Sequence, residues 1–262
     1  MTDREAERAE SRVRLSAVVL TKNEATEIVD CLASLRFCDD VLVVDSGSSD
    51  ATRELARAAG ARVVEHEFVT FAESRNFGLD QALGEWVLSV DADERIPDAL
   101  RDEIVRVVNA PGGMRGFRVR LEDCFCGQWL RHGESARVRP VRLARRDAGR
   151  WTRRVHEYWD VAGAVGELSS PIHHFSHRSV GDFVTRLNSY STLDAAEHFT
   201  NGVRVPAWHL LAYPIGKFGQ NYIVRRGVLD GAMGLGFAML MSFYSFLVRM
   251  KLMLLWRNAR EQ

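Results

Sequence analysis

Four short polar clusters within the first hundred residues carry the side chains best suited to chemistry. They are TKNE at 21–24, DSGSSD at 45–50, SRNFG at 74–78 and DADE at 91–94. In the last cluster Asp91 and Asp93 are two residues apart, so both carboxylates can reach one ligand and one divalent cation. A diphosphate needs positive charge beside it, and a cation held by one or two carboxylates supplies that charge. The clusters therefore favour a nucleotide-sugar site over a solvated acidic loop, in which a lone DxD is also common.

Each cluster adjoins a segment whose pattern predicts a strand or a helix. Apolar runs predict buried strands at 13–20, 41–50, 61–67 and 86–90. Apolar residues at helical spacing predict helices at 24–36, 51–60 and 70–83. Because parallel strands need a crossover between them, this alternation predicts an α/β fold with a doubly wound, mainly parallel sheet. Ligands bind such sheets at the carboxyl ends of the strands, where the polar clusters lie.

The second half of the chain has a different pattern. From about residue 115 short segments predict mixed or antiparallel strands, and they are followed by a helix at 181–200. We therefore expect four regions: a disordered N-terminus at 1–12, a nucleotide-sugar-binding half at 13–110, a smaller acceptor-side half with the catalytic base at 111–200, and an apolar helical extension at 201–262.

Charge, cysteine spacing and the N-terminus narrow the class of protein. Lys plus Arg and Asp plus Glu are both 35, so the net charge of zero gives no reason to expect a nucleic-acid partner. The four cysteines form no CxxC pair, which predicts reduced thiols rather than a zinc site. The N-terminus has no apolar core of the kind that a secretory signal requires. These features predict a cytosolic protein.

The four clusters, in this order and after alternating strands, resemble family 2 glycosyltransferases of the GT-A fold. The chain resembles especially the lipopolysaccharide core β-1,4-glucosyltransferase subgroup of that family, and the resemblance covers about residues 14–200. The resemblance implies a UDP-sugar donor and Mg²⁺ or Mn²⁺ as cofactor. It also implies that the metal is bound by Asp93 and Asp91. The implied donor-binding residues are Thr21, Asn23, Glu24, Asp45, Ser46, Gly47, Arg75, Asp91 and Ala92.

The resemblance further implies a general base near the VHE of residues 155–157. An inverting transferase needs a base that takes the proton of the attacking acceptor hydroxyl. We therefore predict Glu157 as the base, with His156 beside it to orient it. The alternative is an ion pair of Glu157 with one of the two neighbouring arginines at 153–154. If Glu157 is not the base, the remaining candidates are Asp160, Asp123 and Glu122.

Two further segments carry side chains that suit a ligand. The HHFSH of 173–177 contains His174, which we consider as a third metal ligand; the alternative is a strand-end histidine held by hydrogen bonds. The arginine-rich run at 137–154 suits an anionic acceptor such as a phosphorylated glycolipid, or it is only a solvated face.

The C-terminal segment predicts contact with a membrane. Residues 231–248 carry no charge and are followed by three basic side chains, but this run is at the short limit of a span, about 18 to 20 residues. We expect 228–256 to lie as a peripheral helix at the inner membrane. The alternative is a hairpin that packs on the catalytic domain or on a second copy, as in a homodimer.

Together these features predict a cytoplasmic, peripherally membrane-associated inverting glycosyltransferase. Its substrates would be a UDP-hexose, glucose or another, and a lipid-linked saccharide of the cell envelope. Alternative acceptors are a polyprenyl phosphate and a protein side chain, and an alternative function is non-catalytic binding of a nucleotide-sugar by a scaffold. A nucleotidyltransferase is disfavoured because the first loop is not rich in glycine and lysine. A dinucleotide oxidoreductase is disfavoured because no GxGxxG follows the first strand.

Overall fold

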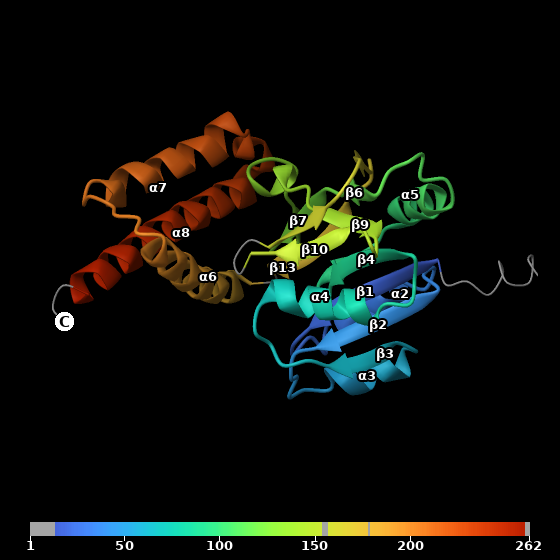
Figure 1. The fold of residues 1–262 in the computed structure, drawn as a ribbon. Coiled ribbons are helices and arrows are strands. Elements are labelled where there is room, and N and C mark those ends of the chain that lie inside the picture. The colour runs from blue at the N-terminus through green and yellow to red at the C-terminus, as the bar shows by residue number, and fades with distance from the viewer. Residues whose placement is uncertain (1–13, 154–156, 178, 260–262) are drawn as a thin grey trace, which may run out of the picture. The chain divides into compact units, whose positions relative to one another are not determined.

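The computed structural model describes residues 14–153, 157–177 and 179–259, and it separates into two compact units (Figure 1). The sheet unit comprises Met1–Arg120 and Arg139–His173, and the helical unit comprises Leu121–Val138 and His174–Gln262. The chain therefore passes from one unit to the other three times.

A seven-stranded sheet forms the centre of the sheet unit. Its strands are β1 (Leu15–Thr21), β2 (Asp40–Asp45), β3 (Arg62–Glu65), β4 (Trp86–Asp91), β6 (Gly116–Arg118), β9 (Val141–Arg145) and β12 (Val165–Glu167). They lie in the order β12-β6-β9-β4-β1-β2-β3. The four strands from β3 to β4 are parallel, whereas β9 runs antiparallel to both β4 and β6. This arrangement confirms the predicted doubly wound, mainly parallel sheet with a smaller mixed region.

The register of the parallel strands brings the polar clusters to one edge. Thr21 lies opposite Asp45, and Leu20 lies opposite Asp91. Because these three strands end together, the loops that follow them are neighbours in space. Three of the four clusters therefore share the carboxyl edge of the sheet as predicted, whereas SRNFG lies within the helix Phe71–Gln81.

Helices cover the sheet (Figure 1), and two tryptophans belong to its core. The helices are α2 (Ile28–Ser34), α3 (Thr52–Ala58), α4 (Phe71–Gln81) and α5 (Asp98–Asn109). Buried Val18, Leu42 and Leu79 belong to one core cluster with Trp151 and Trp159. The two tryptophans stack with ring centroids 5.4 Å apart, across the antiparallel pair β10 (Gly149–Thr152) and β11 (Tyr158–Val161). The core therefore extends from the parallel strands to the two strands on either side of Glu157.

Helix α4 approaches the sheet closely at a glycine. A Cβ on Gly78 would lie 2.4 Å from Cγ1 of Val18 and 3.3 Å from Cγ2 of Val44. At the N-terminus of α4 the side chain of Thr70 accepts a hydrogen bond from the backbone N–H of Glu73. The close packing at Gly78 fixes the distance of α4 from the sheet, and the cap at Thr70 fixes where the helix begins. Together they place the helix that carries Arg75.

Helix α2 is shorter than its sequence pattern predicts. It begins at Ile28 rather than near residue 24. The backbone N–H of Glu24 donates to Oγ1 of Thr52, and that of Ala25 donates to the carboxylate of Asp50. Because these donors bind the neighbouring loop, the chain at 24–27 forms a turn, and the helix starts only after it.

The helical unit combines a small sheet with three long helices. Its sheet contains β7 (Leu121–Phe125), β8 (Gln128–Trp129) and the part of β13 (Ile172–His177) from His174 onward, and these strands lie in the order β13-β7-β8. Its α-helices are α6 (Val180–Thr200), α7 (His209–Gly219) and α8 (Gly231–Asn258), and both α6 and α7 pack along α8. Three short helical turns complete it: η1 (Ser135–Arg137), η2 (Gln220–Val224) and η3 (Gly227–Asp230). Its buried aromatic and aliphatic cluster contains Phe125, Leu130, Phe183, Leu187 and Phe237.

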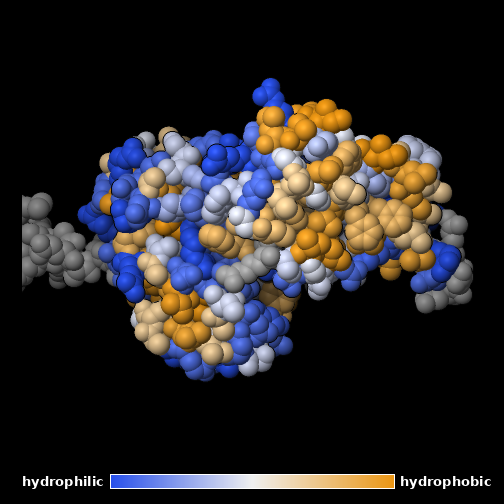
Figure 2. Space-filling view, turned by 180° about the vertical axis from the view of Figure 1, so that it is seen from behind, coloured by the Kyte–Doolittle hydropathy of each residue, from blue (hydrophilic) through white to orange (hydrophobic). Residues whose placement is uncertain are grey.

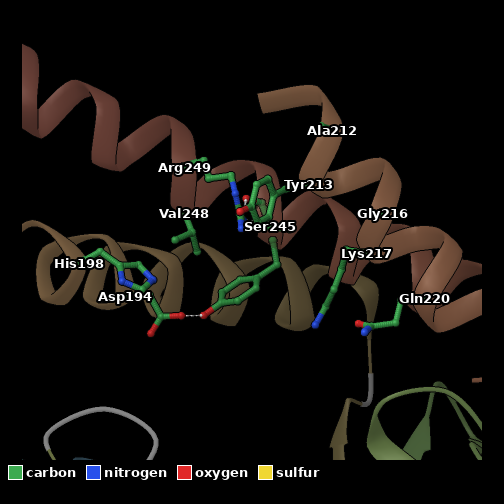
Figure 3. Close-up of a pocket in the computed structure, with 11 residues that line it drawn as sticks. Asp194, His198, Ala212, Tyr213, Gly216, Lys217, Gln220, Ser245, Val248 and Arg249 are labelled. Atoms are coloured by element: carbon green, nitrogen blue, oxygen red, sulfur yellow. Dashed lines mark hydrogen bonds between the residues drawn. The ribbon is translucent and has the colours of Figure 1, made fainter. Parts of the chain in front are cut away.

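An open hollow of about 520 Å³ lies between α6, α7 and α8 (Figure 3). The guanidinium of Arg249 lies 3.8 Å from the ring centroid of Tyr213 on its wall.

All four cysteines are free, which agrees with the expected reduced thiols.

Candidate functional site

The loop after β2 is organised around Asp45. This carboxylate is fully buried, and it accepts hydrogen bonds from the backbone N–H of Gly47 at 3.2 Å and of Ser48 at 2.9 Å. The Ser48 hydroxyl also donates to it. Asp45 therefore holds the loop in shape from within, and its predicted contact with the nucleoside stays a prediction.

The loops after β1 and β2 are bonded to each other. Asn23 has a left-handed backbone with a φ of 57°. Its backbone N–H donates to the Ser48 hydroxyl at 2.8 Å, and its side-chain oxygen accepts from the N–H of Ser49 at 2.7 Å. The backbone N–H of Ser46 donates to the carbonyl of Thr21 at 2.9 Å. The donor-binding residues predicted in the loop after β1 and in the loop after β2 therefore belong to one hydrogen-bonded structure.

The Thr21 side chain is a special case in this structure. It is 5% exposed, and its hydroxyl has no hydrogen-bond partner among the residues that the structure describes. A buried hydroxyl without a partner is costly, but this oxygen is covered by protein atoms, so the predicted contact of Thr21 with the donor stays a prediction.

The DADE cluster forms a turn that is held from two sides. The backbone N–H of Asp91, the last residue of β4, donates to Oε2 of Glu94 at 2.9 Å. Arg95 donates to the carbonyl of Ala92 at 3.0 Å and to the carboxylate of Glu27 at 2.8 Å. Because these contacts fix the backbone on both sides of Asp93, the two aspartates of the turn are presented in a defined geometry.

Arg75 joins the first of these aspartates to the predicted base. Its Nη2 donates to Asp91 at 2.8 Å and its Nε donates to Glu157 at 3.3 Å. A third nitrogen, Nη1, donates to the Ser89 hydroxyl at 2.8 Å, and the guanidinium lies 4.7 Å from the ring centroid of Trp151. Arg75 therefore connects β4, α4 and the segment at Glu157. Its predicted contact with a diphosphate stays a prediction.

Arg142 is a site residue that the sequence analysis missed. It lies on β9 and is 6% exposed, and its Nη2 donates to Asp91 at 3.0 Å and to Glu94 at 2.7 Å. Burial disfavours its charge, but the carboxylates of Glu94 and Asp91 outweigh burial and raise its pKa. Neither interpretation of the run 137–154 describes this buried arginine. The sequence signal that could have found it is the VRLAR of 141–145, in which an arginine stands between apolar residues of a predicted strand. A charge inside a buried strand requires a partner.

Asp91 and Asp93 differ in how they are placed to bind a metal. The carboxylate of Asp91 is bonded by two guanidinium groups, whereas Asp93 belongs to the fixed turn and is 7% exposed. Among the described residues, no group of three or more His, Cys, Asp or Glu side chains is placed to hold an ion. Mg²⁺ is usually bound by one or two carboxylates together with substrate phosphates. The oxygen ligands of this turn therefore fit a cation that is shared with a diphosphate.

His174, the third predicted metal ligand, belongs to the helical unit. Its Nδ1 lies 2.6 Å from Oδ1 of Asp123. This contact agrees with the alternative of a strand-end histidine held by a hydrogen bond, and its role in metal binding stays a prediction.

Glu157 is partly buried and is positioned by Arg75. Its side chain is 17% exposed. The guanidinium of the neighbouring Arg153 lies instead over the ring of Tyr158, at 5.3 Å from the centroid. His156 and Arg154 lie outside the described residues. Of the other candidate bases, Asp160 is exposed on β11, Asp123 is bonded to His174, and Glu122 lies 4.0 Å from Arg131.

Comparisons with known proteins agree with this geometry. The model of the family described as Glycosyl transferase family 2 matches residues 16–152. The lipopolysaccharide core biosynthesis glycosyltransferase LpsC of Rhizobium meliloti (strain 1021) is 30% identical over 250 residues, which are 92% of each chain. An uncharacterized glycosyltransferase of Rickettsia felis is 26% identical over 256 residues, which cover 91% of this chain and 89% of that protein.

Two solved structures show the same fold. The mannosyltransferase PcManGT from Pyrobaculum calidifontis, in complex with GDP-Man and Mn²⁺, has a TM-score of 0.54 at 18% identity and covers 92% of this chain and 87% of its own. Glucosyl-3-phosphoglycerate synthase from Mycobacterium tuberculosis, in complex with Mn²⁺, UDP and glucosyl-3-phosphoglycerate, has a TM-score of 0.50 at 19% identity. It covers 78% of this chain and 86% of its own. This likeness identifies the fold as the GT-A type.

Proposed function

Because the chain belongs to glycosyltransferase family 2 and is therefore a glycosyltransferase, we propose that it moves a hexose from a UDP-sugar, with inversion, onto a lipid-linked saccharide of the cell envelope. The observation that carries the proposal is the contact of one arginine, Arg75, with both Asp91 and Glu157. This contact joins a carboxylate turn suited to a nucleotide-sugar with a carboxylate suited to proton transfer. The name of the relative LpsC supports a lipopolysaccharide acceptor.

In this proposal the donor binds at the edge formed by the loops after β1, β2 and β4. The nucleoside would lie against the loops that contain Asn23 and Asp45, and Asp93 would hold Mg²⁺ or Mn²⁺ beside the diphosphate. The bound cation supplies positive charge for the leaving group. The complexes of the two solved proteins with Mn²⁺ and a nucleotide or nucleotide-sugar support this arrangement.

Glu157 takes the proton in the proposed reaction. The acceptor oxygen forms a bond to the anomeric carbon, the bond from that carbon to the diphosphate breaks, and the hydroxyl proton moves to the carboxylate. Arg75 contacts Oε1 of Glu157, so we assign Oε2 as the oxygen that receives the proton. Arg75 thereby acts as a positioning residue for the base.

We also propose that the protein works at the cytoplasmic face of the inner membrane and contacts it through 228–256. One described helix, Gly227–Asn258, is long and apolar enough to cross a membrane, and 28% of its most apolar window is buried. Its exposed apolar residues include Leu235, Met239 and Phe243, whereas Ala238 and Val248 are buried on another face. A helix that is apolar on its exposed face as well as its buried face supports peripheral contact.

Calorimetric titration with UDP, in the presence and absence of Mn²⁺ and with GDP as the comparison, tests the donor site. We expect Mn²⁺-dependent binding of UDP in preference to GDP. The variant Asp93→Ala should weaken the metal-dependent binding by about tenfold or more, since even outer partners of a metal site contribute on that scale. Asp147→Ala removes an exposed carboxylate of the same unit and should bind as the wild type does.

Two results of this titration would contradict the proposal. Absence of binding for both nucleotides would remove the donor site, and full metal-dependent binding by Asp93→Ala would remove the assigned ligand. UDP binding without turnover on any lipid-linked, polyprenyl phosphate or protein acceptor would instead indicate a nucleotide-sugar-binding scaffold.

A further inference from the structure

Exposed aliphatic side chains gather at the turn that joins α7 to α8. Ile223 is 68% exposed, Val224 72%, Val228 48% and Leu229 62%. Between these two pairs lie Arg225 and Arg226. Four exposed aliphatic side chains within seven residues are unusual for a surface that meets only water.

This turn is rigidly built, so the exposure is not that of a loose loop. The buried carboxylate of Asp230 accepts hydrogen bonds from the backbone N–H of His132 at 2.9 Å and of Arg131 at 3.3 Å. A Cβ on Gly234 would lie 2.0 Å from the carbonyl oxygen of Gly227, so the turn packs with its backbone directly on α8. The scaffold therefore holds the aliphatic side chains outward.

The outer face of α7 continues this surface. Trp208 is 63% exposed, Leu211 70% and Ile215 69%, at positions i, i+3 and i+7 of one helical face. The residues Ala212, Tyr213, Gly216 and Lys217 instead line the hollow between α6, α7 and α8, as Figure 3 shows. The apolar stripe of α7 thus faces away from its helical neighbours. In Figure 2 hydrophobic residues gather over the helices of this unit.

We infer that the turn at 223–229 and the stripe Trp208, Leu211 and Ile215 form a membrane-insertion surface for an anionic lipid leaflet. The charge of the surrounding segment fits this partner, because residues 201–262 carry 8 basic and 2 acidic side chains. The aliphatic side chains enter the boundary between headgroups and acyl chains, and exposed Arg226 lies among the phosphates. The inference rests on the proposed membrane contact and extends it from α8 to the turn and α7.

The test is co-sedimentation of the full chain with vesicles of phosphatidylcholine, alone and mixed with phosphatidylglycerol. The wild type should bind the mixed vesicles. Val224→Glu/Leu229→Glu should lower the bound fraction by about tenfold or more, because carboxylates at an insertion surface oppose both burial and anionic headgroups. The matched control is Leu83→Glu, which places a carboxylate at a 56% exposed leucine of the sheet unit and should bind as the wild type does. Arg226→Gln should weaken binding to the mixed vesicles only.

The outcomes separate this inference from the proposed function. Circular dichroism must show native folding of each variant, and UDP binding is measured on the same samples. Binding of vesicles without binding of UDP would leave the insertion surface standing and contradict the donor site. Equal vesicle binding by the turn variant and Leu83→Glu would overturn the inference. So would a wild type that ignores vesicles and forms a dimer abolished by the turn variant, because the surface would then join two copies.

Discussion

At Asp91 two positive charges meet one carboxylate. Arg75 approaches it from α4 at 2.8 Å and Arg142 approaches it from β9 at 3.0 Å. The side chain of neither arginine is more than 7% exposed. Charge-assisted hydrogen bonds of this kind fix geometry more firmly than neutral ones. Asp91 is therefore held in a fixed position. We propose that it accepts a hydrogen bond from a ligand hydroxyl, and that Asp93 is the better candidate for direct metal binding.

The role of Glu157 is tested by Glu157→Gln. The amide keeps the size of the side chain and a contact with Arg75, but it cannot accept the proton of the acceptor hydroxyl. Turnover should fall by about 10²–10⁴-fold, the usual contribution of a general base, while UDP binding is retained. Steady-state rates together with a nucleotide titration measure both quantities. A folded Glu157→Gln variant with the normal rate would exclude Glu157 as the base.

Arg142 contributes to stability as well as to the site. Arg142→Met leaves the buried carboxylate of Glu94 without its guanidinium partner, and breaking a buried pair costs about 3–5 kcal/mol of unfolding free energy. Arg139→Met, in the same arginine-rich run, removes an exposed pair with Glu167 and should cost about 0–1 kcal/mol. Urea denaturation compares the two variants, and equal losses would show that Arg142 is not part of a buried network.

Sequence pattern located the carboxylates of this site but not the contacts between them. The strand before DADE and the spacing of Asp91 and Asp93 were legible, because apolar runs and short motifs are local features. The contact of Arg75 with Glu157 joins residues 82 positions apart, and nothing in either segment specifies it. Arg142 was hidden because it belongs to a run of arginines whose other members include exposed side chains.

At the scale of elements, α4 is the part that transmits packing to the site. Gly78 lets this helix lie against β1, and Arg75 is one turn before it on the same helix. A change in the distance between α4 and β1 therefore moves the guanidinium of Arg75, which positions Asp91 and Glu157. The glycine of SRNFG belongs to the site through packing rather than chemistry.

Gly78→Ala tests this coupling. Its Cβ would meet Val18 at 2.4 Å, and such overpacking costs about 1–3 kcal/mol of unfolding free energy. Turnover should fall with stability, because α4 must shift. Gly216→Ala, in a helix with nothing within 4 Å of the new Cβ, should instead stabilise by about 0.5–1 kcal/mol. Thermal unfolding and rate measurements decide; a Gly78→Ala variant as stable and active as the wild type would show that α4 does not rest on this contact.

The sequence pattern predicted where a C-terminal helix lies, but it did not predict which helix face is exposed. The apolar tail at 228–256 was recognised as helical, but the exposed stripe of α7 was not. Helix α7 has 11 residues, HLLAYPIGKFG, and its apolar side chains, with Pro214 among them, are not confined to one face. Which face is buried depends on α6 and α8, and only the packing of those helices reveals the face that remains exposed.

At the scale of the whole molecule, the two units are interleaved in sequence. The strands β7 and β8 come from the middle of the chain, yet Phe125 and Leu130 pack with Phe183, Leu187 and Phe237. No single position in the sequence separates the sheet unit from the helical unit. The four regions expected from the sequence, with their bounds and roles, stay a prediction.

Removal of residues 201–262 tests the dependence of β7 and β8 on the C-terminal helices. The truncated chain loses Phe237 from the aromatic cluster and Asp230 from the backbone of His132. Exposure of the remaining cluster should produce association, which light scattering detects, while the full chain at equal concentration serves as the control. A monodisperse truncated chain with native helicity in α6 would contradict this expectation.

The interleaving also sets an order during synthesis on the ribosome. Every residue of the sheet unit has been translated once the chain reaches His173, whereas the cluster around Phe125 must wait for Phe237. Domains fold as units while the chain emerges, N-terminal parts first. We therefore expect the sheet edge that carries the polar clusters to form on the nascent chain before the C-terminal helices cover β7 and β8. Chaperones would then be needed by this internal segment rather than by the sheet.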